Sequence, residues 1–528
     1  MPEQDVISDQ YPTWIGLVYI FNLIVGTGAL TLPAVFSRAG WALGLSVILV
    51  LAFISFVTVT FVIEAMASAN AIVTWRRIQH RKRVSVFHHV YLSIQAFIKH
   101  MKYSQQVLQA IGESAPSNSD SEDTPLVASL PTSPDMAGRY YVIHEKIEMG
   151  QMASIFFNRF GITLFYLCFA VYLYGDLSIY GAAVAKSLAD VACTYLPRNL
   201  TCNDTIPDTE FCWEGSTFNR LDAYRIFVTM FVVSLGPFVF FNVQKTKYLQ
   251  LVTSIMRWLA FTIMIAYALK NLIVYGPRGD PPVASLAGIP SLFGACVYSF
   301  MCHHSLPALV APIANKSRLN RFLALDYTLI ALFYLLLALT GIFAFERLDD
   351  LYTLDFGPRG LADCSKSDNI FMLLIEYFLA LFPVFTLSTS FPIIAITLRN
   401  NLQSLFLQED ASYNLCLRKL VFPILAVVPP YLIAMTTKDL SILVGITGSY
   451  AGAGIQYLIP TLLVYYARKR ADKVIGLGVV NKFASPFSGR CWLAFVVIWA
   501  ITCMILVSVN FMQIHLQSLQ SLQSWFGQ

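Results

Sequence analysis

The sequence predicts an all-α polytopic membrane protein with about eleven transmembrane helices. Its 528 residues are 56% hydrophobic and only 13% charged. The hydrophobic residues come in blocks of roughly 20 or more, the length of a helix that crosses a bilayer. The predicted spans are residues 13–35, 41–65, 162–188, 223–241, 255–275, 292–313, 322–345, 370–398, 421–435, 440–466 and 492–511. A transmembrane domain over 13–512 leaves little chain for a soluble domain, and the acidic leader at 1–12 favours a retained first span.

The first predicted span carries a threonine between two glycines, Gly26-Thr27-Gly28, in its middle. Each glycine weakens a helix by about 1 kcal/mol relative to alanine. Open turns persist in a membrane only where they are buried in protein or line a cavity. A break here would leave N–H groups that suit a carboxylate at the start of one half-helix, and carbonyls that suit a cation at the end of the other. The alternative is that both glycines form a close-packing surface between helices.

The sixth predicted span is interrupted in a similar way. It holds His303, His304, Ser305 and Pro307 at mid-membrane depth, and the proline removes an N–H donor and disfavours helix at Leu306. The two breaks are five spans apart, as an inverted repeat of five plus five would give, with the eleventh span as an addition. Paired breaks in matching halves are the best sequence pointer to the binding site of a transporter.

Short motifs along the chain resemble the amino acid/auxin permease family, within the amino acid–polyamine–organocation superfamily. They are residues 21–23 followed by 26–30 in the first span, 299–303 in the sixth, Gly175, Ser178 and Tyr180 in the third, and 445–449 with Pro460 in the tenth. Residues 172–176 and the long second loop are most similar to the transmembrane protein 104 group. The resemblance covers nearly all spans and implies a transporter fold in which the first and sixth helices are broken.

The resemblance also implies a solute site at the two breaks. The backbone around the first break would hold a substrate carboxylate, and Asn22 would face the site, although an interhelical hydrogen bond explains Asn22 equally well. The candidate substrate-binding residues are Asn22, Val25, Gly26, Thr27, Gly28, Ser299, Cys302 and His303. Adjacent helical residues point in different directions, so we expect at most one of His303 and His304 to face the cavity.

Candidate ion-coupling residues lie in the third and eighth spans. An ionisable side chain at membrane depth is functional by default, and Asp176 is the strongest case; it could bind a cation or a proton, or pair with Lys186. In the eighth span several hydroxyl side chains precede Pro392. In the amino acid/auxin permease family that the chain resembles, a sodium-binding hydroxyl precedes a proline in the same way, and Thr389 is the best match to it. The candidates are Asp176, Thr386, Thr389 and Ser390. The alternative for each hydroxyl is a bond to the backbone of its own helix.

Loop charge predicts a cytoplasmic N-terminus, because about 25 Lys and Arg then fall inside and about nine outside. Loop 193–221 lies outside in this topology; it carries N-glycosylation sequons at Asn199 and Asn203 and three cysteines, which allow at most one internal disulfide. Segment 76–158 lies inside and is predicted to be largely disordered, with 84–111 either an interfacial amphipathic helix or a solvated linker. The C-terminus, 513–528, lies outside.

These features predict a secondary-active transporter of amino acids or related small solutes, coupled to Na⁺ or H⁺. It would work by alternating access in the plasma membrane or an endosomal or lysosomal membrane. The alternative is a non-transporting amino acid sensor that signals through a cytoplasmic partner at 76–158. The sequence holds no phosphate-binding loop, metal-spaced Cys/His set or nucleophile–base pair. It therefore predicts no enzyme activity, no resident metal or organic cofactor and no nucleic-acid partner.

Overall fold

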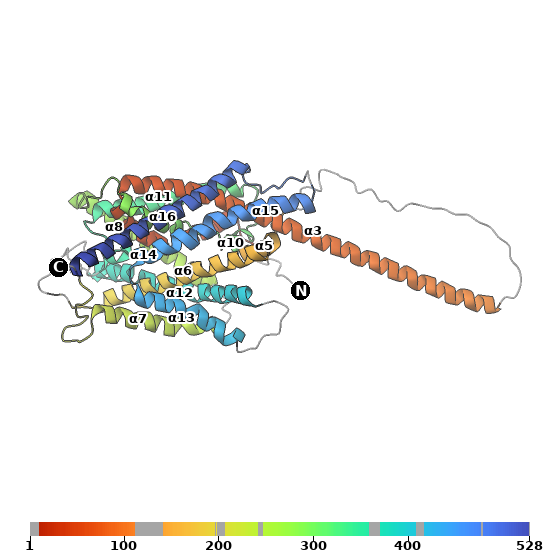
Figure 1. Cartoon of the computed structure of the whole chain (residues 1–528), viewed down its shortest axis with the longest axis horizontal. Helices are drawn as coiled ribbons and strands as arrows, with labels where there is room; N and C mark the ends of the chain where they lie inside the picture. Colours follow the sequence, from red (N-terminus) through yellow and green to blue (C-terminus); the bar gives the residue numbers. More distant parts are fainter. Residues whose placement is uncertain are drawn as a thin grey trace.

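The computed structural model describes residues 10–110, 141–195, 197, 206–240, 247–357, 370–407, 417–476 and 479–526; the side chains of 84–110, 247–251, 417–418, 510 and 513–526 are not described. Helices run along the long axis of one bundle, and a single helix projects from it (Figure 1). In these described ranges there are no strands, only two isolated β-bridges. The predicted all-α class is confirmed.

The spanning helices follow the predicted order. They are α1 (Thr13–Ile24) with α2 (Thr27–Ala39), α3 (Trp41–Ala110), α6 (Arg159–Ala192), α7 (Arg220–Leu235) with η2 (Gly236–Phe240), α8 (Lys247–Tyr275), α9 (Ile289–Ser299) with α10 (Leu306–Val310), α11 (Leu319–Ala344), α12 (Ile370–Phe406), α13 (Phe422–Thr436), α14 (Leu440–Thr447) with α15 (Ile459–Val474), and α16 (Arg490–Phe526). Nine helices of the described chain are long and apolar enough to cross a membrane, and the bent pair α1–α2 makes a tenth. The shorter pair α9–α10 takes the place of the predicted sixth span. The inverted repeat stays a prediction.

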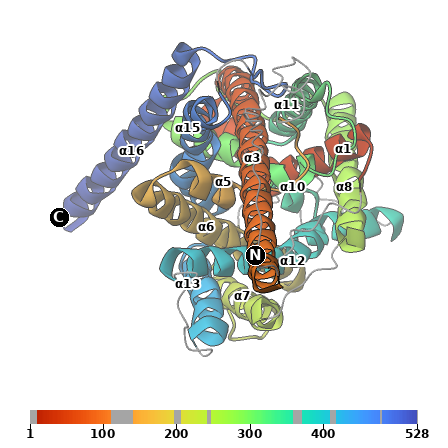
Figure 2. The same cartoon turned by 90° about the vertical axis from the view of Figure 1, so that its right-hand side faces the viewer.

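Burial separates the central spans from the peripheral ones. We compare the most apolar 18-residue stretch of each span. In α3, 67% of this stretch is buried inside the protein, and in the α14–α15 span 78%, whereas in α16 only 22% is buried. Figure 2 shows α16 at the outer edge of the bundle, leaning away from α3. The last helix therefore exposes most of its apolar surface to lipid, as an addition to a central bundle would.

The helix that leaves the bundle is α3, which continues without interruption to Ala110 (Figure 1). The prediction that segment 76–158 is largely disordered is wrong over 76–110, which is helical; that 84–111 is an interfacial amphipathic helix stays a prediction. The physical reason is the absence of helix breakers: no Gly or Pro occurs between Leu45 and Ala110. The Ser-, Pro- and acid-rich residues 114–135 lie outside the described part.

The same prediction is wrong for the end of the segment, which packs back on α3. Tyr141, Ile143 and Ile147 are buried. The amide of Asn70 accepts from the backbone N–H of Glu145 at 3.0 Å, and the Glu145 carboxylate pairs with Arg77. A short helix, α5 (Met149–Phe156), follows and begins with a capping box. Sequence composition missed this because the apolar residues that dock here are few and lie far from their partners along the chain.

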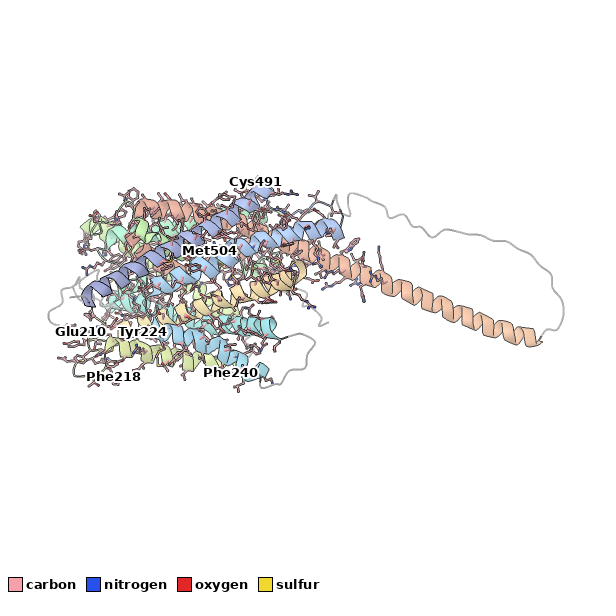
Figure 3. The ribbon with its side chains drawn as sticks, viewed as in Figure 1. Glu210, Phe218, Tyr224, Phe240, Cys491 and Met504 are labelled. Carbon is pink, nitrogen blue, oxygen red and sulfur yellow. A yellow bond between two sulfur atoms is a disulfide. The ribbon has the colours of Figure 1, made fainter. Side chains whose placement is uncertain are left out.

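The polar loop after α6 is closed by a disulfide between Cys193 and Cys212. The prediction of at most one internal disulfide agrees with this bond, while Cys202 and the sequon residues Asn199 and Asn203 lie outside the described residues. Figure 3 shows Glu210 and Phe218 of this loop at the end of the bundle opposite the α3 extension. The C-terminal part of α16 reaches the same end as the loop (Figure 1).

Candidate solute site at two helix breaks

The first span is broken where the sequence predicts. Helix α1 ends at Ile24, α2 begins at Thr27, and the two axes differ by 51°. The backbone N–H groups in the first turn of a helix have no partner within that helix. In the described part of the chain, the N–H groups of Gly26, Thr27 and Gly28 have no hydrogen-bond acceptor. This break therefore presents free donors at the positive end of α2, where a carboxylate would be stabilised.

The two glycines of the break have different roles. A Cβ atom at Gly28 would lie 2.7 Å from the Cα of Ser299, so this glycine lets α2 and α9 touch. A Cβ atom at Gly26 would meet nothing closer than the carbonyl oxygen of Ile24 at 4.0 Å. The packing interpretation thus holds for Gly28, whereas Gly26 faces open space beside the free N–H groups.

The sixth span is also broken. Helix α9 ends at Ser299 and α10 begins at Leu306, with Pro307 in its first turn, where a missing N–H costs no helical bond. The hydroxyl of Tyr334, a fully buried side chain on α11, donates to the carbonyl oxygens of Ile24 and Ser299, each at 2.9 Å. One phenol therefore joins the carbonyl ends of both broken helices.

An arginine lies at the same place. The guanidinium of Arg257 on α8 donates through Nη1 to the carbonyl oxygen of Asn22 in the last turn of α1. The Asn22 side chain is 7% exposed, and its Nδ2 has no partner in the described structure. Both residues line a pocket with Val25 and aromatic rings of α8 and α11, and this pocket is too narrow to admit even a water molecule. This pocket therefore holds no solute-sized space in the structure.

Sequence reasoning missed Tyr334 and Arg257. Arg257 carried a usable signal, because it is an ionisable residue inside the predicted fifth span, 255–275. Tyr334 carried none, since a tyrosine in an apolar helix is most often a packing residue. Its role depends on a contact between helices far apart in the sequence.

The predicted site residues of the sixth span divide between two places. The Oγ of Ser299 donates to Ala295 of its own helix at 2.7 Å, while its backbone touches Gly28. The sulfur of Cys302 lies 3.1 Å from the Tyr327 hydroxyl. The Nε2 of His303 lies 2.9 Å from Thr58 Oγ1 on α3. Only Ser299 lies at the first break in this conformation.

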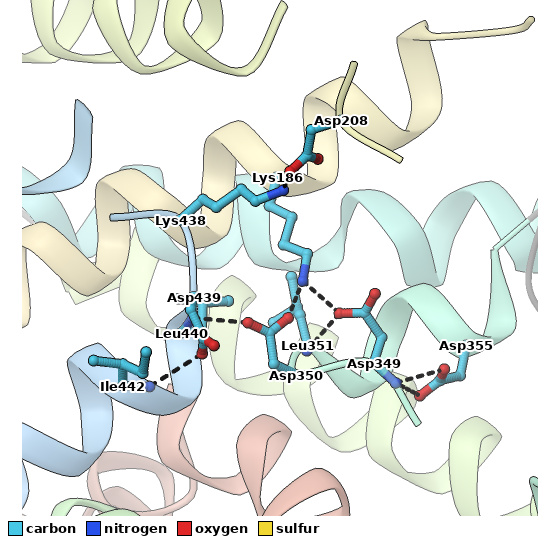
Figure 4. Close-up of polar contacts among 10 residues, drawn as sticks. All are labelled: Lys186, Asp208, Asp349, Asp350, Leu351, Asp355, Lys438, Asp439, Leu440 and Ile442. Carbon is cyan, nitrogen blue, oxygen red and sulfur yellow. Dashed lines mark hydrogen bonds and ion pairs between the residues drawn. The ribbon is translucent and has the colours of Figure 1, made fainter. Parts of the chain in front are cut away.

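Asp176 on α6 is 4% exposed and accepts a hydrogen bond from the Tyr298 hydroxyl on α9. Lys186 is not its partner. The Lys186 ammonium instead pairs with Asp350 and, at 2.5 Å, with Asp349, beyond the end of α11 (Figure 4). The other carboxylate oxygen of Asp350 accepts from the backbone N–H of Leu440, at the start of α14.

The hydroxyls of α12 bond to their own helix. Thr386 donates to Phe382 at 3.0 Å, Thr389 to the carbonyl of Thr386 at 2.8 Å, and Ser390 to the same carbonyl at 3.2 Å. These are the local bonds that the alternative interpretation predicts, and they fix the orientation of the three hydroxyls on α12. Cation binding by these residues stays a prediction.

The opposite end of the bundle from the disulfide loop is held by a second buried ion pair. Both carboxylate oxygens of Glu64 on α3 accept from Arg468 on α15 at 2.7 Å, and one also accepts from the Ser485 backbone N–H at 2.9 Å. Paired, fully hydrogen-bonded charges of this kind hold two helices in one arrangement. Two ion pairs thus join parts of the bundle that are far apart in the sequence, Glu64 with Arg468 and Lys186 with Asp350.

This fold and this pair of breaks define a polytopic membrane protein of the transporter class. The family model described as "Transmembrane amino acid transporter protein" matches residues 10–112 and 136–508, and the chain belongs to that family. It is 52% identical to the transmembrane protein 104 homolog of Drosophila melanogaster, over 95% of this chain and 97% of that protein. It is 46% identical to transmembrane protein 104 of Homo sapiens with the same coverage. Identity to the Dictyostelium discoideum homolog is 32%, over 94% of this chain and 96% of that protein. The resemblance predicted from the motifs is confirmed.

Proposed function

We propose that the protein is a secondary-active transporter of amino acids or related small solutes. The observation that carries the proposal is the set of donors without an acceptor at the first break: the N–H groups of Gly26, Thr27 and Gly28, together with Nδ2 of Asn22 in the last turn of α1. Backbone N–H groups at a helix N-terminus bind anions through hydrogen bonds and the helix dipole together. An amino acid carboxylate is negatively charged and has two acceptor oxygens, so it would satisfy these unpaired donors.

Alternating access explains why the pocket is closed. A solute would reach the breaks only after one end of the bundle opens, and in this scheme an ion pair holds each end: Glu64 of α3 with Arg468 of α15 at one, and Lys186 of α6 with Asp350, in the loop after α11, at the other. Opening one end therefore requires separating one pair while the other holds. In this scheme the Asp176 carboxyl, bonded to Tyr298 of the broken sixth span, couples the motion to an ion or a proton.

In the proposed topology the N-terminus and α3 extension are cytoplasmic, and loop 193–221 and the C-terminus face outside or the lumen. The Cys193–Cys212 disulfide supports this orientation, because such bonds persist in oxidising compartments. Asn199 and Asn203 would then be glycosylated, and the inward-facing sequon at Asn315 would not. The membrane is the plasma membrane or that of endosomes or lysosomes.

The test is uptake of labelled amino acids by purified protein in sealed vesicles, with Asn22→Ala as the matched variant. Loss of one hydrogen bond to a charged group lowers affinity by about 10- to 100-fold. We expect saturable uptake by the wild type and a matching rise in KM for the variant at unchanged thermal stability. Vesicles that accumulate no amino acid under any imposed ion gradient would contradict the proposal.

A second candidate function is an amino acid sensor that does not transport. It is favoured by the α3 helix, which extends beyond the bundle and is held at its base by the Arg77–Glu145 pair (Figure 1). A transporter has no need of this extension, but a signalling partner could bind it. Deleting residues 84–140 separates the two functions: a transporter keeps its flux, whereas a sensor binds solute without flux and loses its response.

A further inference from the structure

The carbonyl end of α1 lies inside the bundle at the first break. The last carbonyls of a helix have no partner within it and carry a partial negative charge. Inside a membrane such groups must be satisfied by protein, solute or ion. Two side chains from neighbouring helices do this here: Arg257 donates to Asn22 and Tyr334 donates to Ile24.

The Arg257 side chain brings a full positive charge to this point, because a guanidinium stays protonated in proteins. Among the side chains that the structure describes, no carboxylate pairs with Arg257, and Asp176 is engaged by Tyr298. The charge of Arg257 is thus compensated by the carbonyl end of α1 rather than by an acidic residue. A cation has the same effect when it binds at the end of a half-helix.

We infer that the Arg257 guanidinium is a built-in cation at the end of α1, and that the protein therefore binds its solute without Na⁺. A sodium ion entering beside Asn22 would meet a fixed like charge in surroundings of low dielectric, where repulsion is strong. The carbonyl oxygen of Asn22, which such an ion would need as a ligand, already accepts from Arg257. A hard cation needs several oxygens at once.

The first test measures thermal stability of the purified full-length protein in sodium chloride and in choline chloride at equal ionic strength. A ligand that binds only the native state raises the unfolding midpoint. We expect the same midpoint for the wild type in both salts. A wild-type midpoint that rises with sodium concentration would overturn the inference, and this arm needs no variant.

The second test removes the charge. Arg257→Ser leaves the α1 carbonyls without their cation and adds a small hydroxyl, so we expect a lower midpoint in choline and a rise of about 2 °C or more in sodium. Arg257→Lys keeps the charge and should stay insensitive to sodium. Arg225→Ser is the matched control, because Arg225 on α7 is exposed and away from the break. Sodium-sensitive Arg257→Lys protein would contradict the inference.

A third test measures amino acid uptake into vesicles and rests on the proposed function. Uptake by the wild type should be equal with sodium or potassium outside. The two failures are distinguishable. Absence of any flux with sodium-insensitive stability would contradict transport and leave the role of Arg257 intact. Flux that requires sodium would contradict the role of Arg257 and leave transport intact.

Discussion

The hydroxyl of Tyr334 lies 2.9 Å from the carbonyl oxygen of Ser299, at the end of α9, and equally far from that of Ile24, at the end of α1. A single hydroxyl has one proton to share between the two acceptors. This phenol therefore links the two breaks directly, and any movement of α1 relative to α9 must change its bonds.

Tyr334→Phe should destabilise the protein, because two buried carbonyls lose their donor. An unsatisfied buried polar group costs about 1–3 kcal/mol. The measurement is the midpoint of denaturant unfolding. Tyr327→Phe is the control: Tyr327 lies on the same helix and is also buried, but its hydroxyl meets the Cys302 sulfur rather than a helix end. Equal losses in the two variants would contradict a special role for Tyr334.

Asp176→Asn should leave the protein folded and remove ion or proton coupling. The asparagine oxygen can still accept from the Tyr298 hydroxyl, but it cannot carry a charge or release a proton at neutral pH. Uptake into vesicles with an imposed pH gradient is the measurement, and an imposed sodium gradient, to which the wild type should not respond, is the control. An unchanged dependence on the pH gradient would remove Asp176 from the mechanism.

The glycines of the first break should respond differently to alanine. Gly28→Ala places a methyl group 2.7 Å from the Ser299 backbone and should cost about 1–3 kcal/mol of stability, as overpacking does. Gly26→Ala has room and should change stability by less than about 0.5 kcal/mol. Thermal unfolding of both variants side by side decides this. A larger loss for Gly26→Ala would show that the open space beside it is filled.

The Lys186 cluster should stabilise its end of the bundle more than a nearby surface pair does. Asp350 is 8% exposed, so Lys186→Met leaves a buried carboxylate without its cation, a loss of about 3 kcal/mol (Figure 4). Lys438→Met removes a pair with Asp208 in which both side chains are more than 40% exposed, and should cost at most about 1 kcal/mol. Chemical denaturation compares the two. A reversed order would mean that the buried cluster is not a structural link.

The sequence predicted the spans well because apolar blocks and their interruptions are local properties. Gly26 with Gly28 and Pro307 break their helices where expected, and the limits of the spans shift by only a few turns. The continuation of α3 was missed because charged, polar composition was read as disorder, although the segment lacks helix breakers.

The contacts of the site were harder to predict than its location. Asn22 and the residues from Val25 to Gly28 lie at the break between α1 and α2, and their binding of a solute stays a prediction, whereas Cys302 and His303 turn toward α11 and α3. Arg257 and Tyr334 act at the break through contacts between helices far apart in the chain. Helix packing decides these directions, and a single sequence does not contain that information.

The central claim is that the free donors at the start of α2 hold the carboxylate of an amino acid. Thermal unfolding of the purified full-length protein with a panel of amino acids and their carboxamides tests this most directly. The account predicts that at least one amino acid raises the midpoint, that its carboxamide does not, and that Asn22→Ala weakens the effect. A panel in which no amino acid shifts the midpoint, or in which the carboxamides stabilise equally, would contradict it.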